Sequence, residues 1–160
     1  MARATNSLMA NRYRSLVIFL VLVVGVGWLI GATNPPGQWY AGLNKPAFNP
    51  PNWIFGPVWT VLYVMIAVAG WRTYLQDKTS ALPMQLWFVQ MALNFSWSPV
   101  VFSLHSLASG LAIILTMLAA IVGFIWIQAA ENRPAAILFL PYAMWAAFAS
   151  VLNYSLYRLN

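Results

Sequence analysis

The chain has 160 residues, of which 62% are apolar and only 6% are charged, with two acidic residues in all. A soluble domain carries about 25% charged residues, so this composition excludes an ordinary water-soluble globular protein. The net charge of +6 would suggest nucleic acid in a soluble protein, but here the basic residues fall at the ends of apolar stretches and indicate membrane topology. The chain has no cysteine, which excludes disulfide and thiol chemistry.

Five apolar stretches of roughly 19–24 residues predict membrane-spanning helices, because about 20 residues cross a hydrocarbon core at 1.5 Å per residue. The stretches do not alternate between apolar and polar residues, as the strands of a membrane barrel would. We therefore predict an all-α membrane protein, a five-transmembrane-helix bundle that forms a single domain over residues 1–160. The predicted helices cover residues 14–32, 53–75, 81–103, 106–128 and 134–157.

Residues 1–13 form a basic leader before the first stretch. The first stretch resembles a secretory signal, but it is longer than a usual signal core and Ile30-Gly31-Ala32 is a poor cleavage site. The basic residues predict a cytoplasmic N-terminus in an inner membrane. A bacterial membrane is expected, and inner or outer location stays open. The N-terminal side would hold Arg3, Arg12, Arg14, Arg72, Lys78 and Arg133, and the opposite side Lys45 and Arg158.

The first connection, residues 33–52, is far longer than the others, which cover residues 76–80, 103–106 and 129–133. Prolines stiffen it and its aromatic side chains are suited to cover an apolar ligand. A long loop in an otherwise economical protein is often functional. We predict that this segment is a lid over a binding site.

Three tryptophans, Trp59, Trp97 and Trp145, lie inside the predicted helices, where a buried indole N–H requires a partner or a ligand. The candidate partners are polar residues within the spans, which usually face a bundle interior. For Asn153, the alternative interpretation is that its side chain joins neighbouring helices rather than lining a site. The candidate partners are Asn94, Ser98 and Asn153, and the tryptophans that the interfacial belt explains are Trp28, Trp53, Trp71, Trp87 and Trp126.

Several kinds of chemistry lack the residues they need. No acidic residue lies within a predicted span, which argues against a proton-coupled transporter. His105 is the only histidine, and we interpret it as a solvated loop residue rather than a haem ligand. No metal site, catalytic triad or phosphate loop can be assembled. Pro99 and Pro141 lie deeper in their helices and predict kinks beside a cavity, or simply improved packing.

Three motifs in order, WY..L.KP.FNPP.W.FGPVWT.LY, Q..LN.SWSPV.F and LPY..WA.FA..LNY, resemble the translocator protein family. This family comprises the TspO/MBR or tryptophan-rich sensory proteins and the mitochondrial peripheral-type benzodiazepine receptors. The resemblance runs from about residue 16 to 158. It implies a five-helix fold, often dimeric, with a pocket roofed by the first loop. It also implies binding of porphyrins such as protoporphyrin IX and haem, of sterols in some members, and of benzodiazepine and isoquinoline drugs, with no obligatory cofactor.

The resemblance also assigns binding residues. The family's pocket tryptophans match Trp59 and Trp145, and the pair in its third helix matches Asn94 and Trp97. Tyr63, one turn beyond Trp59, belongs to the same predicted set. The remaining matches are the aromatic pair and prolines of the first loop and a small position in the fifth helix: Trp39, Tyr40, Pro46, Pro50, Pro51 and Ala149.

The C-terminal stretch fits the loose sterol pattern at Leu152, Tyr154 and Arg158, although Tyr and Arg there are equally explained as interfacial anchors. The pattern alone does not establish sterol binding. It leaves sterol binding as an open prediction.

The leading hypothesis is a membrane receptor or sensor that binds a tetrapyrrole under the lid and regulates tetrapyrrole handling, with Asn94 and Lys45 meeting its polar groups. One alternative is porphyrin degradation driven by light and oxygen, for which Trp59 and Trp145 would be the catalytic candidates, although no general acid or base is available. Transport of tetrapyrroles or other small molecules is another alternative. The expected partners are a flat apolar ligand, membrane lipid or sterol, and a second copy in a homodimer, but not nucleic acid.

Overall fold

The computed structural model describes residues 2–76 and 82–160, with side chains from residue 11 onward in the first segment. The described part of the chain is helical and contains no strand. Helices dominate because the long apolar stretches satisfy their backbone groups internally. The elements are α1 (Ala2–Leu20), π-helical η1 (Val21–Gly25), α2 (Val26–Thr33), α3 (Gln38–Gly42), α4 (Asn52–Tyr74), α5 (Leu82–Ser98), π-helical η2 (Pro99–Ser103), α6 (Leu107–Glu131) and α7 (Arg133–Leu159).

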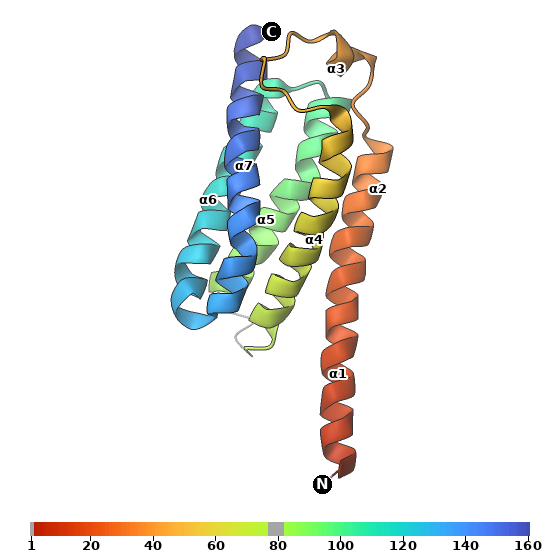
Figure 1. Cartoon of the computed structure of the whole chain (residues 1–160), viewed down its shortest axis with the longest axis vertical. Coiled ribbons are helices and arrows are strands. Elements are labelled where there is room, and N and C mark those ends of the chain that lie inside the picture. Colours follow the sequence, from red (N-terminus) through yellow and green to blue (C-terminus); the bar gives the residue numbers. More distant parts are fainter. Residues whose placement is uncertain (1, 77–81) are drawn as a thin grey trace.

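The first helix begins at Ala2, well before the predicted start at residue 14, and continues through η1 and α2 to Thr33. The prediction was wrong because it followed apolar residues, whereas residues 2–13 contain neither Gly nor Pro and are free to extend the helix beyond the apolar stretch. Figure 1 shows α1 projecting past the end of the bundle. The apolar span itself is Asn11–Thr33.

Four helices in the described residues are long and apolar enough to cross a membrane: Asn11–Thr33, Asn52–Tyr74, Leu107–Glu131 and Arg133–Leu159. The protein is thus an all-α, multi-pass integral membrane protein. The predicted helix 81–103 is not among the four, because its regular part, α5, has only 17 residues and includes Gln90 and Asn94. Both polar side chains are buried in the bundle.

The bundle combines pairs of helices that are neighbours in sequence with one pair, α4 and α7, that is distant in sequence. Helix α6 packs against α5 and α7, and α4 packs against α7 and α1 (Figure 1). Between α6 and α7 the chain turns at Asn132, whose side chain accepts the N–H of Ala135 and caps α7. The predicted connection 76–80 lies, apart from Gln76, outside the described residues.

Glycines on α2 and α4 create room for aromatic rings in the core. A Cβ on Gly70 would overlap the indole of Trp87, and one on Gly27 would overlap the ring of Tyr63. Trp87 is consequently only 5% exposed, and its N–H donates to the carbonyl of Ile66 at 3.0 Å. The expectation that Trp87 belongs to the interfacial belt was wrong. Its position near a helix end gave no sign that Gly70 on α4 leaves room for the indole.

The two predicted proline kinks have different outcomes. At Pro99, α5 changes into the π-helical segment η2, because proline supplies no N–H to the α-helical ladder. At Pro141, α7 continues as an α-helix. The segment η1 was not foreseen; it lies just before Gly27, where α2 meets Tyr63.

Candidate functional site

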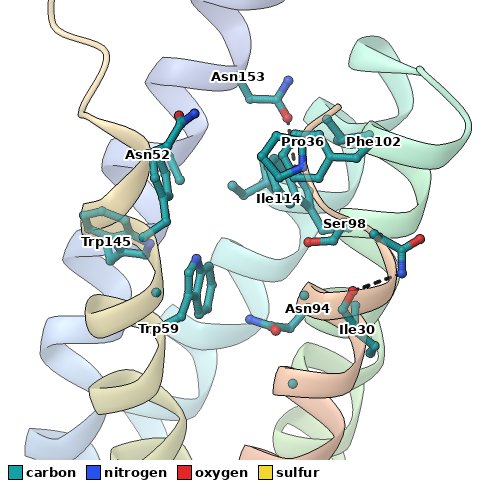
Figure 2. Close-up of a pocket in the computed structure, with 18 of the residues that line it drawn as sticks. Ile30, Pro36, Asn52, Trp59, Asn94, Ser98, Phe102, Ile114, Trp145 and Asn153 are labelled. Carbon is teal, nitrogen blue, oxygen red and sulfur yellow. Dashed lines mark hydrogen bonds between the residues drawn. The ribbon is translucent and has the colours of Figure 1, made fainter. Parts of the chain in front are cut away.

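An apolar cavity of about 420 Å³ lies inside the end of the bundle that carries α3. Helices α2, α4, α5, α6 and α7 form its walls, and Tyr40 of α3 reaches it from above. Figure 2 shows Trp59 and Trp145 on one side, with Asn94 and Ser98 opposite. The predicted site residues that line it are Tyr40, Trp59, Tyr63, Asn94, Trp97, Trp145, Ala149 and Leu152.

The three interior tryptophans all line this cavity, but their N–H groups differ. Trp97 donates to Oδ1 of Asn153 at 3.2 Å, which confirms Asn153 as an indole partner. Asn153 also donates to the carbonyl of Leu107, so it links α5, α6 and α7. The N–H of Trp145 is buried and has no hydrogen-bond partner. It lacks the partner that a buried polar group normally has.

Aromatic contacts hold the other two tryptophans in place. The ring of Trp59 lies 5.3 Å from that of Tyr63, measured between centroids. Trp145 lies between two phenylalanines, with centroid distances of 5.8 Å to Phe55 on α4 and 5.5 Å to Phe148 on α7. These edge-on and tilted arrangements are the favoured ones for aromatic pairs.

Asn94 connects the cavity to a buried hydrogen-bond network. It accepts from the hydroxyl of Tyr63 at 3.1 Å and donates to the hydroxyl of Tyr142 at 2.8 Å. Tyr142 in turn donates to Gln90 at 2.9 Å, and Gln90 donates to the carbonyl of Trp87 at 2.9 Å. Asn94 thus lies on the cavity wall, but its amide is committed to neighbouring tyrosines rather than to an indole.

The predicted lid contains a helical turn, α3, that its prolines did not suggest. Tyr40 of α3 is buried against Phe102 and donates to Asn49 at 3.4 Å, and burial raises the pKa of its phenol. Asn160 accepts from the backbone N–H of Asn44 at 2.9 Å and donates to its carbonyl at 3.1 Å. The lid is therefore tied to the C-terminal end of α7.

A second tie joins the lid to the turn before α6. The ring of Trp39 stacks on that of His105, with centroids 4.3 Å apart. His105 is exposed, as expected, but it adopts a left-handed backbone conformation with φ of 53°. Sequence alone gave no signal for this stack.

Other predicted site residues lie away from the cavity. Trp39, Pro46, Pro50 and Pro51 belong to the lid but do not line the cavity. The ammonium of Lys45 lies 4.9 Å from the centre of the Tyr40 ring and donates to the carbonyls of Ala41 and Leu43.

The sterol pattern is divided between two surfaces. Leu152 is buried and lines the cavity, whereas Tyr154 and Arg158 are exposed on the outer side of α7. Sterol binding stays a prediction.

The structure adds lining residues that sequence reasoning did not select. Gly27 and Gly31 bring α2 to the cavity edge, Phe55 supports Trp145, and Pro36 lies at the start of the lid (Figure 2). A Cβ on Gly27 would overlap the ring of Tyr63, whereas one on Gly31 would meet no atom within 4 Å, so only Gly27 is a position of close approach.

These features define a class: a multi-pass helical membrane protein with a tryptophan-lined cavity under a long first connection. Comparison with known proteins identifies the family, because the model of the TspO/MBR family matches residues 17–158. The chain belongs to the TspO/MBR family, as the motifs predicted.

Relatives come from bacteria, archaea and mammals. The chain is 36% identical to the tryptophan-rich protein TspO of Archaeoglobus fulgidus, over 89% of this chain and 94% of that protein. It is 34% identical to the tryptophan-rich sensory protein of Cereibacter sphaeroides, over 91% of this chain and 92% of that one. Identity to the translocator protein of Homo sapiens is 34%, over 87% and 86% of the two chains.

Proposed function

We propose that this protein is a membrane receptor that binds a flat apolar ligand of the tetrapyrrole class, such as protoporphyrin IX or haem, in the cavity under the lid. The observation that carries the proposal is the group of Trp59, Trp97 and Trp145 around one apolar cavity. Indole rings offer large apolar faces on which a flat conjugated ring stacks. The name of the relative from Cereibacter sphaeroides, a tryptophan-rich sensory protein, supports a sensory role.

The size and polarity of the cavity support such a ligand. A volume of about 420 Å³ falls within the roughly 300–1,000 Å³ usual for sites that take a small molecule. The partnerless N–H of Trp145 supplies a donor for a carboxylate or carbonyl at the ligand's edge. The ammonium of Lys45 already donates to two carbonyls of the lid. A propionate would therefore accept a hydrogen bond from Trp145 rather than from Lys45.

In the membrane, we place α5 together with η2 as a fifth span. The 22 residues from Leu82 to Ser103 are continuous helix, about 30 Å long at the usual rise per residue. Gln90 and Asn94 of α5 are tolerated in such a span because both are buried in the bundle. A cytoplasmic N-terminus in an inner membrane and a homodimer complete the proposal.

Fluorescence quenching tests the cavity. Adding protoporphyrin IX to the protein in detergent should quench indole emission, and the double variant Trp59→Phe/Trp145→Phe should bind roughly tenfold more weakly, because two stacking surfaces are reduced. Trp126→Phe is the matched control, since Trp126 is 82% exposed and does not line the cavity. Equal affinity in the double variant and the control would overturn the assignment of the ligand to this cavity.

A further inference from the structure

A second apolar hollow lies on the outer side of the bundle between α4 and α7. This groove, of about 590 Å³, is lined by Pro57, Val58, Val61, Leu62, Met65, Pro141, Met144 and Trp145. Every one of these side chains is apolar apart from the indole N–H of Trp145. Leu62 is buried at its base, whereas Val61 is 60% exposed and Met144 is 75% exposed at its rims.

The groove faces the lipid. Its lining residues come from Asn52–Tyr74 and Arg133–Leu159, both of which are membrane spans by length and hydropathy. Hydrocarbon is therefore its surrounding solvent, and a molecule dissolved in the bilayer reaches it without crossing water.

One side chain lines both this groove and the interior cavity. Trp145 is the only residue common to the linings of the groove and the cavity, as far as the described residues show. Figure 2 shows its indole beside that of Trp59, at the α4–α7 side of the cavity. A change of rotamer at this one position would join the two spaces.

Rotation of Trp145 would break no hydrogen bond, because its buried N–H has no partner. It would break the ring contacts with Phe55 and Phe148 and the packing of the indole against the main apolar core. Pro57 and Pro141 lie within α4 and α7, and each lacks the N–H that would bond one turn back, although both helices continue through these positions.

The lid is fastened much more firmly. Opening it would break both hydrogen bonds between the backbone of Asn44 and the side chain of Asn160, and also the stack of Trp39 on His105. It would also expose Tyr40, which is buried against Phe102.

We propose that the groove between α4 and α7 is the docking site for an apolar ligand dissolved in the bilayer, and that the ligand passes from it into the cavity when Trp145 rotates. The proposal rests on the proposed function, because it concerns the route to the same cavity. The occupant is the flat tetrapyrrole itself, delivered from the hydrocarbon phase. Trp145 is a gating residue on this route as well as a wall of the site.

The route is tested by filling the groove without touching the cavity. Val61→Trp and, from the opposite rim, Met144→Trp place an indole in the groove, and neither residue lines the cavity. In reconstituted vesicles preloaded with protoporphyrin IX, association measured by quenching should slow roughly tenfold, with dissociation slowed equally and Kd unchanged. Val122→Trp on α6, where Val122 is 53% exposed, is the control and should leave both rates unchanged.

A locked lid supplies the converse experiment. The natural chain has no cysteine, so Asn44→Cys/Asn160→Cys introduces a single disulfide where lid and α7 meet. Its oxidation should leave the association rate unchanged. An association rate that is unchanged in both groove variants would overturn the proposed route, and so would loss of binding when the lid is locked. Neither result would contradict the proposed receptor function. Absence of binding to the unsubstituted protein would instead overturn the proposed function.

Discussion

Single glycines decide which aromatic residues enter the core of this bundle. Trp87 occupies the space that a side chain on Gly70 would take, and Tyr63 does the same opposite Gly27. Both aromatic residues then reach polar partners, the carbonyl of Ile66 and the amide of Asn94. The sequence signals for these contacts are weak, because a glycine in an apolar helix indicates close approach without naming the neighbour.

Replacing Gly70 by Ala should destabilise the protein. The new Cβ overlaps the indole of Trp87, which is held in place by its hydrogen bond to Ile66, so the ring or α4 must shift. Overpacking of this kind costs about 1–3 kcal/mol. Thermal unfolding in detergent should show a lower midpoint for Gly70→Ala.

The control for this change lies on the same helix. A Cβ on Gly56 meets no atom within 4 Å, so Gly56→Ala should be neutral or slightly stabilising. Equal midpoints for the two variants would contradict the role assigned to Gly70.

Among the elements, the lid is the one whose structure could be predicted least completely from its amino-acid composition. Proline and tryptophan content predicted a stiff aromatic cover, and Tyr40 does line the cavity. The helical turn α3 and the ties to Asn160 and His105 depend on partners more than 60 residues away in the chain. No local pattern reports such contacts. Pro46, Pro50 and Pro51 were assigned to the site by the family resemblance, which did not select Pro36.

The spans show the opposite behaviour. Hydropathy located the four spans found in the described residues to within a few residues, except at the start of α1, because lipid imposes the same requirement on every lipid-facing position. Helix α5 is the informative case. It has only 17 residues and includes Gln90 and Asn94, which are buried in the bundle, so it is not among the helices long and apolar enough to be identified as spans.

Closure of the lid should weaken at high pH because of Tyr40. Burial raises the pKa of this phenol above its ordinary value of 10.0, so the closed lid favours the neutral form. The stabilisation is complete below pH 10 and is lost as the pH rises through the raised pKa, where the phenolate favours release. Spin labels at Gly42 and Ala108, both exposed, should report a wider distance above that pH.

Tyr40→Phe is the control that isolates this group, because it removes the titrating hydroxyl and keeps the ring. The variant should keep one lid distance across the same pH range. If both proteins open together as the pH rises, Tyr40 is not the responsible group.

At the scale of the whole molecule, one buried network of polar side chains connects three helices of the bundle. It runs from Tyr63 on α4 through Asn94 on α5 to Tyr142 on α7, and returns to Gln90 on α5. Each member has a partner within the network, so three helices are fixed in register around the end of the cavity. A network of this kind specifies one arrangement of helices because any slip leaves a buried group unpaired.

Removing one hydroxyl from this network should therefore affect both stability and the site. Tyr142→Phe leaves the amide of Asn94 and the carbonyl of Gln90 without their buried partner, at a cost of about 2–3 kcal/mol in the free energy of unfolding. Unfolding in mixed micelles should show this loss. Tyr157→Phe on the exposed side of α7 should change the stability by less than about 0.5 kcal/mol.

The same variant separates a structural network from one that shapes the cavity. Tyr142 does not line the cavity, whereas Asn94 and Tyr63 do. If the network positions Asn94, Tyr142→Phe should also weaken protoporphyrin binding at temperatures where the protein remains folded, because the freed amide can turn into the cavity. Lower stability with unchanged affinity would mean that the network holds the helices together but leaves the shape of the binding site to its tryptophans.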